Sequence, residues 1–187
     1  MAMINPEKAI KDFVIRSMKF EKYKKLIDDL LKTDVSMDAD YQKNFNGFFR
    51  VRKNQDWQKE YYSLFESVKL GDLTFADIIT EIYRRTGTVE ASFSSKMLAT
   101  INPNMPIWDQ FVLKNLGLKL TGSDSKEKLG NAIVLYEEIQ KWYENYLKTD
   151  NAKECLAFFD ETFVDYKWMT DVKKIDFFLW NMREDEE

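Results

Sequence analysis

The residues best suited to chemistry lie around Asp109, within the segment Ala91 to Val112. Pro103 and Pro106 precede Asp109, and because neither proline fits inside a helix, residues 102–107 are expected to form a short, stiff connector. An Asp after such a connector can cap the helix that follows. A carboxylate in a partly dry pocket can also stabilise the sugar cation that develops when an N-glycosidic bond breaks. Both roles, helix cap and catalytic carboxylate, stay open for Asp109.

A basic and aromatic stretch between Tyr41 and Lys53 is the second candidate site, and it contains no acidic residue. Its cations can pair with phosphates, and its rings can stack on an unstacked base. The alternative is a core segment whose cations stay in water. The cations are Lys43, Arg50, Arg52 and Lys53, and the aromatic residues are Tyr41, Phe45, Phe48 and Phe49.

Several kinds of chemistry are excluded by composition. The 187 residues contain no histidine, which removes Ser-His-Asp and Cys-His mechanisms and His-ligated zinc. Cys155 is expected to be a buried structural thiol, and adjacent carboxylates point to different sides of a helix, so no metal site is expected. Ser92, Ser94 and Ser95 lie beside Lys96 without a glycine elbow, so they are interpreted as small residues on a packed helix. We expect neither a metal nor a cofactor.

Length and charge indicate one domain of 1–187, with 44% hydrophobic residues to fill its core. The start has no apolar signal segment and no stretch is long and apolar enough to span a membrane, so a cytoplasmic protein is expected. The net charge is −4, with 17 basic and 15 acidic residues in 1–100 against 11 and 17 in 101–187. This acidic balance, which includes the tail 184–187, is not typical of a strong nucleic-acid binder.

Apolar residues recur three and four apart almost throughout, which predicts an all-α domain of about eight or nine helices. Thr74 is a predicted N-cap, and Arg84, Arg85 and Gly87 form a predicted helix end. Asp56 is the expected cap of the preceding helix. The predicted helices are Pro6–Met18, Lys22–Lys32, Asp56–Leu70, Phe75–Arg85, Glu90–Ile101, Asp109–Leu116, Ser125–Leu147, Ala152–Val164 and Asp171–Met182.

The segment around Asp109 resembles the helix-hairpin-helix DNA glycosylases, in which a Pro, a hydrophobic residue and an Asp precede a helix that ends in Leu-Gly. The matching residues are Pro106, Asp109, Val112, Leu116 and Gly117. The run Phe48 to Asn54, together with Trp57, is similar to bacterial 8-oxoguanine glycosylase-like proteins. The resemblance covers about residues 45–117. It implies the fold of that superfamily and double-stranded DNA with a damaged base as the partner.

The resemblance also implies roles for individual residues. Asp109 would stabilise the cationic sugar as the base leaves or position the attacking water. DNA contacts are expected from Arg50, Arg52, Lys53, Arg84, Arg85 and Gly87, which should share one face with the mouth of the Asp109 cleft if DNA is bound. The base pocket is expected to involve Trp108, Phe49 and Trp57. One of Trp168, Phe177, Phe178 or Trp180 is a further candidate for stacking on the base.

Two departures from the family pattern shape the functional hypothesis. The hairpin segment Thr86 to Val89 has one glycine where the family usually has two. Bifunctional members carry a lysine nucleophile just after the hairpin, whereas the nearest lysine here, Lys96, lies thirteen residues before Asp109 and in mid-helix, several residues too close. We therefore favour a glycosylase without a Schiff-base lysine, which would be monofunctional. The alternatives are a non-catalytic nucleic-acid- or protein-binding module of the same fold, and an all-α interaction module with no nucleic-acid role.

Overall fold

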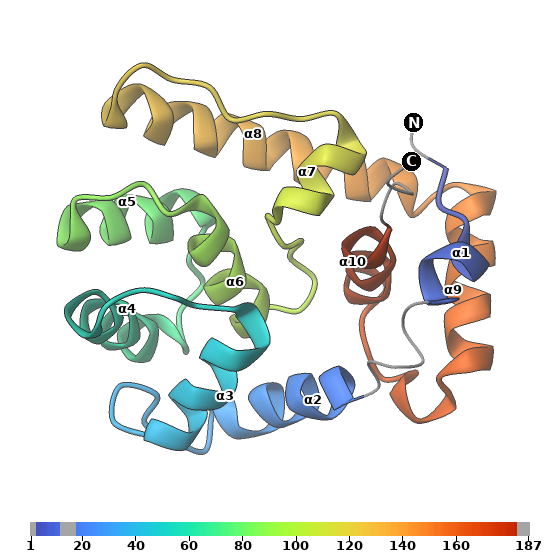
Figure 1. The fold of residues 1–187 in the computed structure, drawn as a ribbon, viewed down its shortest axis with the longest axis horizontal. Helices are drawn as coiled ribbons and strands as arrows, with labels where there is room; N and C mark the ends of the chain where they lie inside the picture. The colour runs from blue at the N-terminus through green and yellow to red at the C-terminus, as the bar shows by residue number, and fades with distance from the viewer. Residues whose placement is uncertain (1–2, 12–17, 183–187) are drawn as a thin grey trace.

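The computed structural model describes residues 3–11 and 18–182, with side chains at 3–9 and 20–182. About 70% of the described residues are helical, and no strand occurs among them, so the all-α prediction is confirmed (Figure 1). The ten α-helices of these ranges are α1 (Pro6–Lys11), α2 (Met18–Leu30), α3 (Ala39–Phe49), α4 (Gln55–Val68), α5 (Phe75–Thr86), α6 (Ala91–Ile101), α7 (Gln110–Leu116), α8 (Ser125–Tyr146), α9 (Asp150–Thr162) and α10 (Asp171–Asn181). Phe13, Val14 and Ser17 of the first predicted helix, and the acidic tail, lie outside the described residues.

Helix α3 is absent from the sequence-based assignment, and it explains the basic and aromatic stretch. Its four aromatic residues, Tyr41, Phe45, Phe48 and Phe49, are all buried. Their spacing of three and four places them on one face of the helix, against the core. The Asp38 side chain accepts a hydrogen bond from the Tyr41 N–H at 2.8 Å and begins the helix. The aromatic rings therefore pack inside the protein.

Local capping signals fix most of the other helix ends. Thr74 and Asp77 form a reciprocal capping box at the start of α5, which ends at Gly87 in the left-handed conformation (φ 70°). The prediction of Thr74 as a cap and Gly87 as a stop is confirmed. At α4 the prediction is wrong: the cap is Asn54, which accepts the Trp57 N–H at 2.9 Å, and Asp56 lies in the first turn. Asn and Asp cap helices equally well, so residue type alone does not identify the cap. The helix begins after Asn54, whose backbone is extended.

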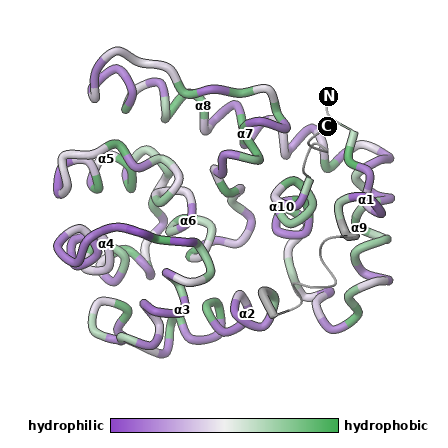
Figure 2. Tube along the Cα trace, viewed as in Figure 1, coloured by the Kyte–Doolittle hydropathy of each residue, from purple (hydrophilic) through white to green (hydrophobic). Residues whose placement is uncertain are grey.

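The helices pack around α6 and α10. Helix α6 contacts α5 and α2, while α10 contacts α7, α1 and α9. Helix α8 runs along one edge of the molecule and packs on α5 (Figure 1). Hydrophobic and hydrophilic residues alternate along the helices in Figure 2, as expected for helices that bury one face each. The segment between α3 and α4 is strongly hydrophilic in the same view.

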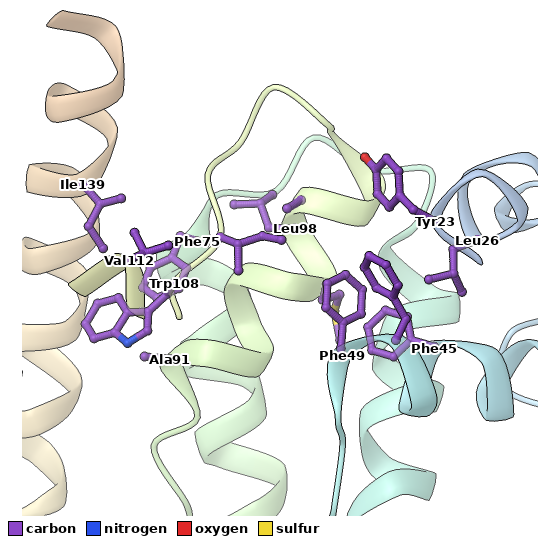
Figure 3. Close-up of a cluster of buried hydrophobic side chains, with 14 of the residues drawn as sticks. Tyr23, Leu26, Phe45, Phe49, Phe75, Ala91, Leu98, Trp108, Val112 and Ile139 are labelled. Carbon is purple, nitrogen blue, oxygen red and sulfur yellow. The ribbon is translucent and has the colours of Figure 1, made fainter. Parts of the chain in front are cut away.

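Helix α6 is buried on nearly all sides, unlike its neighbours. Every residue from Ser94 to Thr100 is buried, including the charged Lys96. Figure 3 shows Leu98 of α6 between Trp108 and Ile139 on one side and Phe45 and Phe49 on the other. This central position places the polar side chains of α6 next to the connector that leads to Asp109.

Candidate active site around Lys96 and Asp109

The connector between α6 and α7 is held by side chains from three helices. Four long-range hydrogen bonds join a connector backbone atom to one of these side chains. They are Thr170 Oγ1 to the Pro103 carbonyl (2.6 Å), Tyr136 OH to the Pro106 carbonyl (2.8 Å), Ile107 N–H to Asp176 Oδ1 (3.3 Å) and Trp108 N–H to Ser95 Oγ (2.9 Å). The connector therefore leaves Asp109 in a defined place at the start of α7.

Asp109 is the N-cap of α7, as predicted. Its Oδ1 accepts the Phe111 N–H at 2.9 Å, and α7 ends at Gly117 with φ 67°. The side chain is half-buried. The Asp109 charge opposes the lowering of the Lys96 pKa by burial, and it adds to the raised pKa of the buried Tyr143 hydroxyl. Its role as a cap is thus combined with an electrostatic link to two buried side chains.

The connector folds back so that the start of α7, with Asp109, lies beside the part of α6 that carries Lys96. Lys96 and Asp109 are the neighbours of Ser95 and Trp108, whose 2.9 Å hydrogen bond folds the connector back onto α6. The sequence spacing concerned the position of the lysine in the family pattern and made no prediction of its distance from Asp109 in the folded chain. The absence of a Schiff-base lysine stays a prediction.

The environment of Lys96 favours the neutral amine. Its side chain is only 6% exposed, and Nζ lies 3.5 Å from the Phe49 carbonyl oxygen and 5.1 Å from the Phe93 ring centroid. Burial lowers the pKa of Lys96, Asp109 opposes this change, and Arg50 lowers the pKa further. A buried amine with a lowered pKa beside a carboxylate is a combination found at functional sites.

Arg50 is the third charged residue of this centre. Among the residues that the structure describes, it is the only non-glycine residue with positive φ (55°), and it closes α3 in the left-handed conformation. A non-glycine residue in this conformation costs of order 1 kcal/mol, which points to a functional constraint. Arg50 is exposed to solvent, and its positive charge helps to lower the pKa of the buried Lys96 amine.

The predicted base-pocket residues lie in different surroundings. Phe49 is 2% exposed and Trp108 is 5% exposed, with Trp108 stacked on Phe75 at 6.3 Å between ring centroids. Both rings are core residues in this structure, so their burial gives no support to a stacking role. Trp57 stacks on Tyr61 at 4.9 Å and lines a surface groove.

Two surface grooves flank α5. The first, of about 380 Å³, brings together Lys53, Trp57, Arg85 and Thr88 from the predicted DNA-binding region. It also contains Asp56 and Glu60, which offset its positive charge. The second, of about 500 Å³, lies between α5, α6 and α8. Asp109 lines neither groove, so the expected cleft at Asp109 is not one of these two.

Three of the predicted DNA-binding cations form ion pairs with acidic side chains of the same chain. Lys53 forms an ion pair with Glu90, and Arg84 and Arg85 both pair with Glu81 at 2.6 and 2.7 Å. These two arginines lower the pKa of Glu81 to about 2 through hydrogen bonds. Arg52 is exposed, and Gly87 is exposed at the turn after α5. The predicted phosphate contacts are thus partly occupied by intramolecular partners.

A buried polar cluster on α10 escaped sequence analysis. Lys173 Nζ lies 2.7 Å from Asp176 Oδ2, and Tyr143 OH donates to Asp176 Oδ1 at 2.5 Å. All three side chains are at most 3% exposed. Burial raises the pKa of Asp176 while Lys173 opposes the change, and burial followed by the Asp176 charge raises the pKa of Tyr143. The detectable signal is a Lys-x-x-Asp pair directly before the apolar run Phe177 to Trp180.

Other site types are not formed by the described part of the chain. No three Cys, Asp or Glu side chains there come together in a group that could hold a metal ion, and Cys155 is buried with its thiol free of a disulfide. No helix in those ranges is long and apolar enough to pass through a membrane. Comparisons with family models, curated proteins and solved structures found no match to this chain.

Proposed function

We propose that this protein releases a damaged base from double-stranded DNA, with Asp109 as the carboxylate that stabilises the sugar cation. The observation that carries the proposal is the charged centre formed by Asp109, buried Lys96 and exposed Arg50. A rigid connector holds Asp109 in this centre through bonds to three helices. Pre-positioned charge in a poorly solvated site is the arrangement that such a reaction requires.

The reaction assigns one task to each residue. The bond between sugar C1′ and the base nitrogen breaks, and the base leaves with the bonding electrons. The positive charge that develops on the sugar is stabilised by the Asp109 carboxylate. The ammonium form of Lys96, made more acidic by the lowered pKa, delivers a proton to the departing base and becomes the neutral amine that burial favours. Water then attacks C1′ and passes its proton to the neutral Lys96 amine, which yields an abasic site and restores the ammonium form of Lys96.

Substrate entry requires side-chain movement. Lys96 is covered in this structure, with Phe49 and Phe93 against its amine. A base turned out of the duplex has to displace these rings, so we expect binding by induced fit. Exposed Arg50 and Arg52 are placed at the end of α3 to hold the phosphates during this movement.

The test is base release from a panel of duplexes that each contain one lesion. Abasic product would be measured for the wild type and for Asp109→Asn, Lys96→Gln and Asp124→Asn. Asp124 is a matched control because it also caps a helix, accepting the Glu127 N–H at 2.8 Å on an exposed loop. We expect release by the wild type and Asp124→Asn, slower release by Lys96→Gln, which lacks the proton donor, and release slower by about 100-fold or more in Asp109→Asn. No product from any duplex, or full release by Asp109→Asn, would contradict the proposal.

A second candidate, a non-catalytic binding module of the same fold, is favoured by the charge distribution. The net charge is −4, and Lys53, Arg84 and Arg85 are all engaged by acidic side chains. Binding of lesion-bearing duplexes without base release would support a nucleic-acid-binding module. Absence of both binding and release would favour a protein partner instead.

A further inference from the structure

Two opposite charges occupy the apolar side of α10. Lys173 and Asp176 lie one turn apart and are 2% and 3% exposed. Their neighbours Ile175, Phe177 and Phe178 belong to the hydrophobic core. An ion pair in such surroundings adds little stability over apolar residues of the same size, because removing two charges from water is costly. Packing alone therefore gives a weak reason for this pair.

The two oxygens of Asp176 have different partners. Oδ2 accepts from Lys173 Nζ at 2.7 Å, which neutralises the charge within α10. Oδ1 accepts from Tyr143 OH of α8 at 2.5 Å and from the Ile107 N–H of the connector at 3.3 Å. One carboxylate thus joins three segments that are far apart in sequence.

The connector bond lies two residues before Asp109. Because Asp176 accepts this bond and the bond from Tyr143 on the same oxygen, the α10 cluster lies beside the segment that leads into the candidate active site. The other long-range bonds of the connector backbone involve the hydroxyl groups of Ser95, Tyr136 and Thr170. Asp176 supplies the charged acceptor, and bonds to charged groups are the stronger ones.

We infer that Asp176 is a positioning residue that holds the connector, and through it the Asp109 carboxylate, against Lys96. Lys173 donates to Oδ2 and Tyr143 donates to Oδ1, and together these bonds fix the orientation of the Asp176 carboxylate. The inference that this placement serves base release rests on the proposed function. The placement itself is a property of the fold and can be measured without any substrate.

The test uses two double variants that leave no unpaired buried charge. Lys173→Met with Asp176→Leu removes the acceptor for Ile107, whereas Lys173→Met with Asp176→Asn removes the same charges and keeps an acceptor oxygen. Both are expected to fold, because apolar or neutral replacement of a buried ion pair is tolerated. The second variant is therefore the matched control for the first.

Three measurements follow from the role of Asp176. Amide hydrogen exchange at Ile107 should quicken at least tenfold in the Leu variant and stay near wild type in the Asn variant. The pKa of Lys96, followed by NMR of its side chain, should fall further in the Leu variant, because the opposing charge of Asp109 is no longer held in place. The kcat of base release should fall at least tenfold in the Leu variant with KM little changed, and recover in the Asn variant.

The outcomes separate the inference from the proposed function. Unchanged exchange at Ile107 and an unchanged Lys96 pKa in the Leu variant would overturn the positioning role, whatever the activity. Equal loss of kcat in both variants would also overturn it, since the tether would not be the cause. If the wild type releases no base, the proposed function fails, while the exchange and NMR results still decide whether Asp176 positions Asp109.

Discussion

Replacement of Lys96 by methionine should stabilise this protein at neutral pH. Methionine keeps the unbranched stem of lysine and its contacts while removing the amine. The amine makes one long contact with the Phe49 carbonyl, at 3.5 Å, and lies 5.1 and 6.0 Å from the Phe93 and Phe49 rings. Its lowered pKa shows that these contacts and the Asp109 charge do not offset the cost of burial.

The sign of the pH dependence follows from the same shift. The folded-state pKa of Lys96 is below its ordinary value of 10.5, so between these two values the unfolded chain binds more protons. Wild-type stability linked to Lys96 therefore rises with pH across that window and is lowest below it. The methionine variant lacks this contribution, so its advantage over the wild type should shrink as the pH approaches 10.5.

Urea denaturation of both proteins at pH 7 and at higher pH measures this effect. We expect a gain of about 1 kcal/mol in the free energy of unfolding at pH 7, or about 2 to 4 °C in Tm. Lys173→Met is the contrasting variant, because it leaves Asp176 charged and unpaired in the core and should cost about 3 to 5 kcal/mol. A loss of stability in Lys96→Met, or a difference that does not vary with pH, would refute the claim that the burial of the Lys96 amine is not fully compensated.

Three further outcomes are expected from the structure. Arg50→Gly should raise the free energy of unfolding by about 0.5 to 1 kcal/mol, because φ 55° favours glycine. Arg52→Gly is the control and should give no such gain, so equal effects of the two substitutions in calorimetry would contradict the prediction. Thr74→Ala removes the capping box of α5 and should cost about 1 kcal/mol by chemical denaturation, with no cost indicating that the box is unimportant. Charge reversal of Arg50 and Arg52 should weaken DNA binding and flatten its salt dependence more than charge reversal of Arg84 and Arg85, because the latter two already pair with Glu81. The opposite order in a salt titration would indicate that DNA binds at α5 instead.

The parts of the fold that sequence predicted depend on short-range signals. The Thr74 cap, the Gly87 stop and the Asp109 cap each involve residues within four positions of one another. Helix α3 was missed because its aromatic residues suggested a binding surface, although their spacing also fits a buried helical face. The same residues supported two interpretations, and burial decided between them.

The candidate site depends on contacts that sequence spacing does not reveal. Asp109 was identified from its local pattern, but its proximity to Lys96 arises from the bond between Ser95 and Trp108. The Asp176 bond to Ile107 spans 69 positions. Periodicity assigned α10 to the core, and it could not show that two charges of this helix would be buried against the connector. Through-space pairing of this kind follows from tertiary packing.

The catalytic role of Asp109 is tested most directly by single-turnover base release from the best lesion duplex, with wild type and Asp109→Asn compared at equal folded concentration. The amide keeps an oxygen for the Phe111 N–H, so stability should change by no more than about 1 kcal/mol. Loss of the charge that stabilises the sugar cation should slow release by about 100-fold or more. Equal rates for the two proteins would contradict the catalytic role and leave Asp109 as a helix cap.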